Sequence, residues 1–300
     1  MRRLQLVVNP FAGRGRAARL LPSVEAALRT AGHDLVISAT RSLPHAAELA
    51  EQAAADGRVA VAMGGDGTVG RVATAVAAAG GVLGVLPGGR GNDFCRATGI
   101  PLRAVAACQV LTFGLERRVD LGVVSSAAGD ACFLGIASVG FDSDVQERVL
   151  SSRLPLGPLV YRWAAVRTVA GWQHTTYSCT LDGHPLTVHG WAVAVANSGV
   201  YGGGMRLAPD ADLADGRLDV VWSAATSRLR FLRMLAKVFR GTHVEEPSVS
   251  VRQAQVVGLA ADRSFRVFAD GDPVGSLPAT VTVRPGAVRV LLRASELLPA

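Results

Sequence analysis

Residues 58–71 place a short apolar run directly before a Gly-Gly-Asp-Gly-Thr turn at 64–68. The run is typical of a buried strand, and after the turn apolar residues recur at helical spacing until Gly80. A strand, a glycine turn and a helix in this order form a corner where backbone N–H groups and the helix dipole favour phosphate. Asp66 would repel bare phosphate, so we expect it to act through Mg²⁺ or bound water. An ordinary tight turn is the alternative for one such corner alone.

The same order occurs twice more in the first third of the chain. A strand predicted at 4–8 leads into the loop 9–15, and a strand at 82–86 leads into the glycine-rich loop 87–94. A further strand is predicted at 34–39, with helices at about 17–30 and 44–55. Alternation of this kind through about residue 115 predicts a parallel sheet with right-handed crossovers. Ligands of such sheets bind beyond the carboxyl ends of the strands, so the three loops should converge on one site.

From about residue 119 the pattern changes to short alternating runs. Turn pairs such as Asp182-Gly183 and Asp270-Gly271 separate them, which is typical of β-hairpins. Strands are predicted at 117–124, 131–138, 175–181, 186–196, 218–222, 249–257, 264–269 and 280–292, with helical insertions at 151–172 and 226–240. The predicted fold is therefore an α/β domain with a parallel sheet, residues 1–118, and a mostly antiparallel β-sandwich or flattened barrel, residues 119–289. Whether 290–300 completes the first domain stays open at this point.

Composition limits the class of protein. Hydrophobic residues make up 49% and charged residues 18% of the 300 residues, which predicts a globular rather than a disordered chain. No apolar run approaches the roughly 20 residues of a membrane-spanning helix, and the run at 4–8 is too short for a signal peptide, so we expect a cytoplasmic protein. The net charge of +7 indicates an anionic partner: a nucleotide, a nucleic acid or an acidic membrane surface. Neither the six histidines nor the four scattered cysteines, which we expect to be reduced, show a metal-binding spacing.

Several motifs keep their order over nearly the whole chain. They are Asn-Pro-Phe-Ala-Gly at 9–13, the turn at 64–68, Leu-Pro-Gly-Gly-Arg-Gly-Asn-Asp-Phe at 86–94, Gly-Phe-Asp at 140–142, Tyr-Gly-Gly-Gly-Met at 201–205, Asp-Gly-Arg-Leu-Asp-Val at 215–220 and Asp-Gly-Asp at 270–272. Together they resemble the diacylglycerol kinase catalytic family, which includes bacterial soluble lipid kinases and the sphingosine and ceramide kinases. The turn at 64–68 alone also fits NAD kinases. The resemblance implies a nucleotide-binding domain similar to NAD kinase and phosphofructokinase, joined to a β-rich lipid-binding domain.

The resemblance also implies ATP and Mg²⁺ as cofactors and assigns residues to them. The positions that match the ATP-binding residues of bacterial members are Asn9, Pro10, Phe11, Ala12, Gly13, Thr40, Gly64, Gly65, Asp66, Gly67, Thr68, Val69, Gly70 and Arg90. A structural Mg²⁺ loop would use the carboxylate of Asp215 and backbone carbonyls at Asp212 and Arg217, which are oxygen ligands that suit a hard cation. Asp272 matches the glutamate that acts as general base. Without the resemblance, Asp215 and Asp272 are interpreted as ordinary turn and hairpin residues.

Three residues depart from the family pattern: Gly70 replaces an asparagine, Arg90 a threonine and Asp272 a glutamate. The guanidinium of Arg90 could still hold phosphate in a bidentate manner. The shorter Asp272 side chain sets its carboxylate about 1 Å or more further back, which matters for catalysis. The predicted function is ATP- and Mg²⁺-dependent transfer of the γ-phosphoryl group to the hydroxyl of a diacylglycerol-like lipid. An NAD kinase-like enzyme and a nucleotide-binding regulator without turnover are the alternatives.

A lipid substrate requires contact with a membrane. The helix predicted at 226–240 alternates arginines with large apolar residues, and basic amphipathic helices bind anionic membrane surfaces. The same pattern fits a helix whose apolar face packs on the β-domain, and both can hold at once. Tyr161, Trp163 and Trp172 mark a second candidate for peripheral membrane contact. No basic–aromatic pattern of a nucleic-acid-binding module is present, and the sequence leaves a homodimer open.

Overall fold

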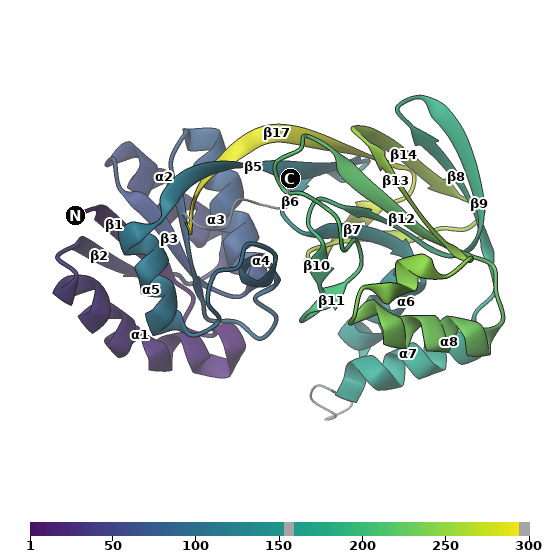
Figure 1. Cartoon of the computed structure of the whole chain (residues 1–300), viewed down its shortest axis with the longest axis horizontal. Coiled ribbons are helices and arrows are strands. Elements are labelled where there is room, and N and C mark those ends of the chain that lie inside the picture. Colours follow the sequence, from purple (N-terminus) through teal and green to yellow (C-terminus); the bar gives the residue numbers. More distant parts are fainter. Residues whose placement is uncertain (153–158, 294–300) are drawn as a thin grey trace.

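The computed structural model describes residues 1–152 and 159–293. Two domains lie side by side and are bridged by two long strands (Figure 1). The N-terminal domain has a parallel sheet with helices, and the C-terminal domain is an antiparallel β-sandwich, so the predicted fold class is confirmed. Each domain has its own hydrophobic core, and all four cysteines are free.

Strands and helices alternate in the N-terminal domain, whose parallel strands lie in the order β2–β1–β3–β4. The strands β1, β3 and β4 are buried along nearly their whole length, as expected for parallel strands covered on both faces. The elements are β1 (Arg3–Val8), α1 (Ala12–Thr30), β2 (Asp34–Ala39), α2 (Leu43–Ala55), β3 (Val59–Gly64), α3 (Asp66–Ala79), β4 (Leu83–Pro87), α4 (Asp93–Ala97) and α5 (Ala104–Phe113).

Local chemistry sets the starts of two helices. Ser42 caps α2, because its hydroxyl accepts a hydrogen bond from the backbone N–H of His45 at 3.2 Å, and Pro44 lies in the first turn as predicted. Residues 13–15 have positive φ, so the regular part of α1 begins after them, close to the predicted residue 17.

The bridge between the domains consists of β5 (Leu115–Ser126) and β17 (Ala279–Leu292), which pair in antiparallel fashion over most of their length. Val290 of β17 also pairs in parallel with Leu83 of β4. The last described strand therefore continues the sheet of the N-terminal domain, while residues 294–300 of the segment 290–300 lie outside the described residues.

The C-terminal domain is built from antiparallel pairs. The predicted hairpins at Asp182-Gly183 and Asp270-Gly271 form, and all four residues have positive φ. The elements are β6 (Gly129–Phe133), β7 (Ile136–Gly140), α6 (Phe141–Ser151), α7 (Leu159–Gly171), β8 (Thr175–Leu181), β9 (His184–Ala196), β10 (Val200–Tyr201), β11 (Met205–Arg206), β12 (Leu218–Ala224), α8 (Arg228–Val238), the 3₁₀ helix η1 (Thr242–Glu245), β13 (Val249–Ala254), β14 (Val256–Ala261), β15 (Arg266–Ala269) and β16 (Asp272–Ser276).

Two predicted strands are wrong because each is interrupted. The run 131–138 is divided into β6 and β7, since Leu134 and Gly135 donate their backbone N–H groups to the carboxylate of Asp270. The run 249–257 is divided into β13 and β14, since Gln255 donates its backbone N–H to the carboxylate of Asp182. In both places an aspartate of a hairpin turn replaces a strand partner.

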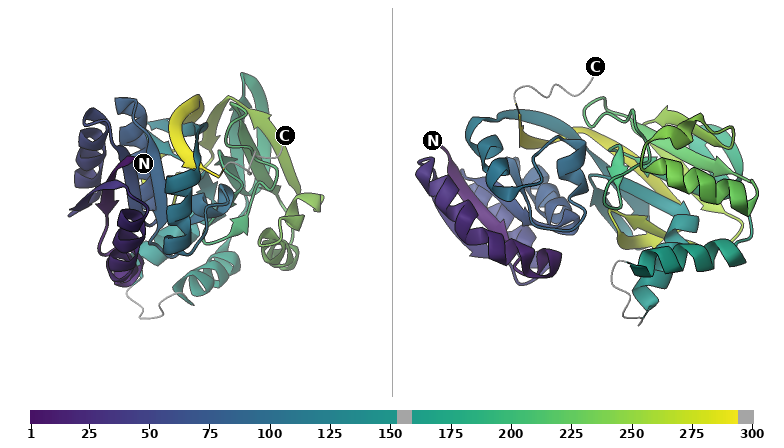
Figure 2. Two further views of the ribbon diagram at one scale, coloured as in Figure 1. Left: turned by 60° about the vertical axis from the view of Figure 1, so that its left-hand side comes forward. Right: turned by 60° about the horizontal axis from the view of Figure 1, so that its bottom comes forward.

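The helical insertions also differ from the prediction. In place of one helix at 151–172, α6 begins earlier and α7 follows it, with residues 153–158 outside the described ones. Trp172 is buried and stacks on Trp191, so the predicted membrane contact of this side chain is wrong. Figure 2 shows α6, α7 and α8 on the same side of the C-terminal domain. Within residues 1–152 and 159–293, no helix is long and apolar enough to span a membrane.

Candidate functional site

The three glycine loops meet at the carboxyl edge of the parallel sheet, as expected from the sequence. Gly88, after β4, donates its backbone N–H to the carbonyl of Gly64, at the end of β3, at 2.8 Å. Asn9, after β1, donates its backbone N–H to the carbonyl of Met63 at 3.0 Å. The side-chain amide of Asn9 also donates to the hydroxyl of Thr68 at 3.1 Å.

The loop backbones touch where only glycine fits. A Cβ on Gly13, whose φ is +60°, would lie 2.6 Å from the carbonyl oxygen of Gly88. A Cβ on Gly89 would lie 2.4 Å from the Cα of Gly65. Both distances are far inside van der Waals contact, so a side chain at either position would push the loops apart.

The other residues expected to bind ATP lie around these loops. Phe11 is 79% exposed, and Arg90 is exposed without a side-chain partner in the described part of the chain. Thr40 is buried at the end of β2, and its hydroxyl donates to the carbonyl of Ser42 at 2.6 Å. The hydroxyl of Thr40 therefore shapes the entry to α2.

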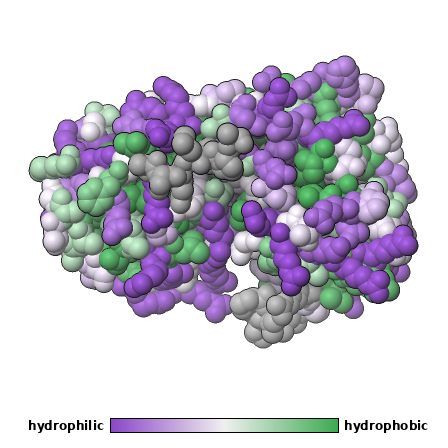
Figure 3. Space-filling view, viewed as in Figure 1, coloured by the Kyte–Doolittle hydropathy of each residue, from purple (hydrophilic) through white to green (hydrophobic). Residues whose placement is uncertain are grey.

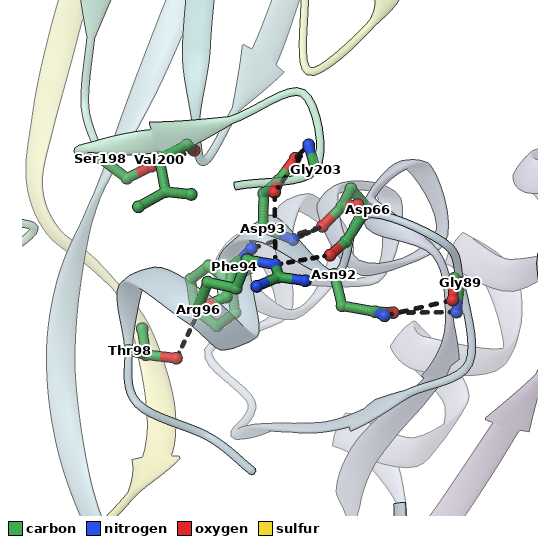
Figure 4. Close-up of polar contacts among 11 residues, drawn as sticks. Asp66, Gly89, Asn92, Asp93, Phe94, Arg96, Thr98, Ser198, Val200 and Gly203 are labelled. Atoms are coloured by element: carbon green, nitrogen blue, oxygen red, sulfur yellow. Dashed lines mark hydrogen bonds and ion pairs between the residues drawn. The ribbon is translucent and has the colours of Figure 1, made fainter. Parts of the chain in front are cut away.

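Asp66 joins the second and third loops. One carboxylate oxygen, Oδ1, accepts hydrogen bonds from the backbone N–H groups of Asp93 at 2.6 Å and Phe94 at 3.3 Å, at the start of α4 (Figure 4). The other oxygen lies 2.9 Å from the position that a Cβ on Gly91 would occupy. Half of the carboxylate is thus held by backbone amides, and the second oxygen faces the loop 87–92.

Asp93 connects the two domains. Both of its carboxylate oxygens accept from the backbone N–H of Gly203, at 3.0 and 2.9 Å, in the turn between β10 and β11 (Figure 4). Burial raises the pKa of Asp93, the hydrogen bond from Gly203 opposes this rise, and the negative charge of Asp66 adds to it. No role for Asp93 followed from the sequence, although its place in the glycine-rich loop 86–94 was the available signal.

The glycine turn that holds Asp93 is itself fixed by a buried carboxylate. Asp142, at the start of α6, accepts hydrogen bonds from Ser138 Oγ at 2.6 Å, Gln146 Nε2 at 2.9 Å and the hydroxyl of Tyr201 at 3.3 Å. Burial raises the pKa of Asp142. Since Tyr201 is two residues before Gly203, this network positions the turn that reaches the N-terminal domain.

The β15–β16 hairpin faces the first turns of α3 across the domain boundary. Asp272 Oδ2 lies 3.4 Å from the position of a Cβ on Gly67, and Asp270 Oδ2 lies 3.7 Å from that of a Cβ on Gly70. Although Asp272 is an exposed residue, partial burial of its carboxylate raises its pKa, and the positive charge of Arg71 opposes the rise. The predicted base therefore lies beside the glycine corner, on the opposing domain.

Asp270 anchors this hairpin. Its carboxylate accepts hydrogen bonds from the backbone N–H groups of Leu134 at 2.9 Å, Gly135 at 2.9 Å and Ile136 at 3.1 Å. A Cβ on Gly135 would lie 2.5 Å from Asp270 Oδ1, so position 135 requires glycine. Burial raises the pKa of Asp270 to about 6 despite these hydrogen bonds, and the charge of Asp66 adds to the rise.

The loop predicted to hold a structural Mg²⁺ is folded around its own backbone. Asp215 accepts from the backbone N–H of Arg217 at 2.8 Å and from Gln253 Nε2 at 3.1 Å. Asp212 accepts from the backbone N–H of Ala214 at 2.9 Å. Both aspartates therefore carry turn hydrogen bonds, and Arg217 contributes to the turn through its backbone.

A third carboxylate, which sequence reasoning missed, lies near this loop. Asp120 is 1% exposed and accepts from the backbone N–H groups of Gly216 and Gly286, each at 2.7 Å. Burial raises the pKa of Asp120, and the charges of Asp215 and Asp212 add to the rise. Among the described residues, no three or more His, Cys, Asp or Glu side chains are arranged to hold a metal ion. A cation here would need backbone carbonyls and water among its ligands, as Mg²⁺ commonly does.

Comparisons with known proteins agree with this division of the chain. Residues 3–124 match the diacylglycerol kinase catalytic domain, and residues 135–292 match the YegS C-terminal NAD kinase beta sandwich-like domain. A diacylglycerol kinase of Mycobacterium tuberculosis is 33% identical over 95% of this chain and 93% of that protein, and one of Bacillus subtilis is 28% identical over 93% and 92%. The crystal structure of a diacylglycerol kinase from Bacillus anthracis has the same fold, with a TM-score of 0.76 at 21% identity over 98% of both chains. The chain belongs to the diacylglycerol kinase family.

Proposed function

We propose that this protein transfers the γ-phosphoryl group of ATP to the hydroxyl group of a diacylglycerol-like lipid. The observation that carries the proposal is the meeting of three glycine loops with the Asp272 hairpin at the boundary of the two domains. The space-filling view shows a hollow between the domains (Figure 3). The names of the relatives, diacylglycerol kinases of two bacteria, support a diacylglycerol-like acceptor.

The nucleotide belongs to the N-terminal side of this boundary. We assign residues 1–118, completed by 290–293, to the nucleotide-binding domain and residues 119–289 to the lipid domain. In this proposal the phosphates lie over the loops 9–13 and 64–70, where backbone N–H groups and the start of α3 attract negative charge. The exposed Arg90 adds a positive charge beside them, and Thr40 borders the same edge of the sheet.

Asp272 acts as the general base. It takes the proton of the lipid hydroxyl while the hydroxyl oxygen forms a bond to the γ-phosphorus, and the bond from that phosphorus to the β-phosphate oxygen breaks, which releases ADP. A base must be ionised when substrate binds. The positive charge of Arg71 favours the ionised form of Asp272 against the effect of burial.

Mg²⁺ enters this proposal with ATP and at the loop 212–217. Asp66 and Asp93 would hold the ion that accompanies the nucleotide, because one carboxylate oxygen of each lies within 3.1 Å of the same Cβ position on Gly91. Asp120 would stabilise the ion of the loop 212–217 through its negative charge. When bound, Mg²⁺ neutralises charge on the phosphates.

A lipid acceptor places the enzyme at a bilayer, and α8 suits that contact. Its buried face packs into the domain core through Phe231, Met234 and Val238. Leu229, Leu232 and the C-cap Phe239 are 59%, 41% and 59% exposed, and five basic residues lie between 226 and 240. One face of the helix therefore packs on the domain, while we propose that the other makes peripheral contact with an anionic membrane surface.

Turnover with a panel of acceptors tests the function. Purified protein is incubated with ATP, Mg²⁺ and either diacylglycerol, sphingosine, ceramide or NAD, and both ADP and the phosphorylated product are measured. Phosphorylated diacylglycerol is the expected product. Phosphorylation of NAD alone would replace the proposal with an NAD kinase, and nucleotide binding without turnover on any acceptor would replace it with a nucleotide-binding regulator.

A further inference from the structure

We propose that a cavity at the N-terminus of α8 binds the phosphate headgroup of an anionic membrane phospholipid, at a site separate from the catalytic one. This site rests on the membrane contact proposed above. The cavity has a volume of about 640 Å³, which is within the usual range for small-ligand sites. It lies between residues 172–174, which connect α7 to β8, the strand β9, and the start of α8 with the two residues before it. None of its lining residues belongs to the three glycine loops or to the Asp272 hairpin.

The rim of this cavity offers hydrogen-bond donors and no carboxylate. His174, His189 and Arg228 all line it. His174 makes no hydrogen bond within the described residues, and His189 uses only Nδ1, toward the hydroxyl of Thr176 at 3.2 Å. Ser227, the N-cap of α8, lines the cavity as well, so the positive end of the helix dipole adds to the attraction for an anion.

The buried wall carries two indole N–H groups that lack an acceptor. Trp191 and Trp172 are 1% and 6% exposed, and neither Nε1 has a hydrogen-bond partner among the described residues. The two rings stack at 5.8 Å, and Trp191 also stacks on Phe231 of α8 at 3.8 Å, so neither indole is free to turn toward another acceptor. Buried donors nearly always have partners. Both Nε1 atoms are themselves buried, so the aromatic wall contributes shape and apolar contact, and the donors open to a ligand are those of the rim, on His174, His189 and Arg228.

A neighbouring cavity shows why the anion belongs to the first. This second cavity, of about 350 Å³, shares Trp172 and His174 with the first. Its walls include Asp144 and Asp262, and its Arg263 is paired with Asp144 at 3.0 Å. With Arg148 the lining of the second cavity carries two positive and two negative side chains, so it has no net charge, whereas the first cavity has Arg228 and no carboxylate. An anion is therefore favoured on the side of α8.

The outer face of α8 indicates that the anion comes from a lipid. Leu229 directly follows Arg228, and its exposed side chain begins the apolar face that continues through Leu232 and Phe239. With this face against a bilayer, the cavity at the start of the helix lies at headgroup level. A phospholipid can then place its phosphate at the rim without leaving the bilayer, and the aromatic wall accommodates its glycerol and first methylene groups.

A matched pair of variants tests the site. Arg228→Met and Arg230→Met each remove one positive charge from α8, so general attraction to anionic vesicles falls equally, but only Arg228 lines the cavity. Arg228 Nη2 also donates to the carbonyl of Trp172 at 3.3 Å, so thermal melting of both variants checks that a selective loss is not structural. Binding is measured to phosphatidylcholine vesicles with and without phosphatidylglycerol. We expect Arg228→Met to bind the phosphatidylglycerol vesicles about tenfold more weakly than Arg230→Met, the effect of losing one hydrogen bond to a charged group. Equal losses in the two variants would overturn the proposal.

A second variant distinguishes binding of a lipid headgroup from binding of a soluble phosphate, and its melting temperature controls for misfolding. His174→Ala removes an exposed ring that makes no hydrogen bond within the described residues, so it should melt close to the wild type and still show the selective loss on phosphatidylglycerol vesicles. Calorimetric titration with glycerol 3-phosphate measures whether the cavity binds a soluble phosphate. Saturable binding that His174→Ala weakens, with vesicle binding unchanged, would overturn the lipid proposal in favour of a soluble ligand. None of these measurements needs turnover, so their failure is distinct from a failure of the kinase assay.

Discussion

Asp272→Asn is the most direct test of the catalytic arrangement. The amide keeps the size and position of the side chain beside Gly67 but cannot take the proton of the acceptor hydroxyl. A positioned general base contributes about 10²- to 10⁴-fold, so we expect kcat on diacylglycerol to fall by that factor, which is about 2.7–5.5 kcal/mol of transition-state stabilisation. ATP affinity should stay unchanged, because the loops proposed to hold ATP lie on the opposite domain.

The raised pKa of Asp272 also predicts how the thermal stability of Asp272→Asn compares with that of the wild type. Folding favours the protonated carboxyl, so the ionised form slightly destabilises the protein at neutral pH, and Asp272→Asn should melt at the wild-type temperature or above it. Asp272→Glu, which moves the carboxylate about 1 Å or more further, keeps a base on the hairpin and should retain part of the turnover. The assay combines ADP release with lipid in mixed micelles, calorimetric ATP binding and thermal melting. Wild-type turnover by Asp272→Asn would refute the assignment of the base.

Three further predictions concern the surroundings of the base. Gly89→Ala should lower the melting temperature and abolish ATP binding, because its Cβ would lie 2.4 Å from the Cα of Gly65, whereas Gly65→Ala, with 3.5 Å to Gly89, should melt like the wild type. The free energy of unfolding should fall as pH rises from about 4 to about 6, because Asp270 binds its proton more tightly in the folded protein than in the unfolded chain. Asp270→Asn should flatten this part of the pH profile. An unchanged slope in the variant would contradict the assignment of this pH dependence to Asp270. Arg71→Gln should move the acid limb of kcat to higher pH, and an unmoved limb would contradict its role beside Asp272.

The parts of the site that local signals determine were predictable. Each glycine loop follows a buried strand and precedes a helix or helical turn, and β1, β3 and β4 are neighbours in a parallel sheet, so their loops meet at one edge. The hairpin at 270–271 was also predictable, because Asp-Gly suits positive φ at both positions. The proposed role of Asp272 as base, by contrast, depends on the family resemblance, since the residue alone is typical of a hairpin.

Contacts between distant segments were not predictable. Asp93 meets Gly203 across 110 residues, and Asp270 divides the strand predicted at 131–138 from more than 130 residues away. Neither aspartate differs in sequence from an ordinary turn residue. The prediction for Trp172 was wrong for the opposite reason: a segment with Tyr161, Trp163 and Trp172 is typical of a membrane interface, but the stack with Trp191 buries Trp172 in the domain core.

Two departures from the family pattern, Gly70 and Asp272, lie on the two sides of the boundary between α3 and the β15–β16 hairpin. Gly70 stands where the family has an asparagine, and a Cβ there would already be in van der Waals contact with the carboxylate of Asp270, at 3.7 Å. The remaining atoms of an asparagine would need room that the hairpin occupies. Glycine at position 70 therefore lets the hairpin approach α3, which brings the shorter Asp272 to within 3.4 Å of the Cβ position of Gly67. Gly70 on α3 and Asp272 on the hairpin are both smaller than the family's residues, and the closer approach that Gly70 permits compensates for the shorter Asp272. For this reason we expect the carboxylate of Asp272 to reach the acceptor hydroxyl.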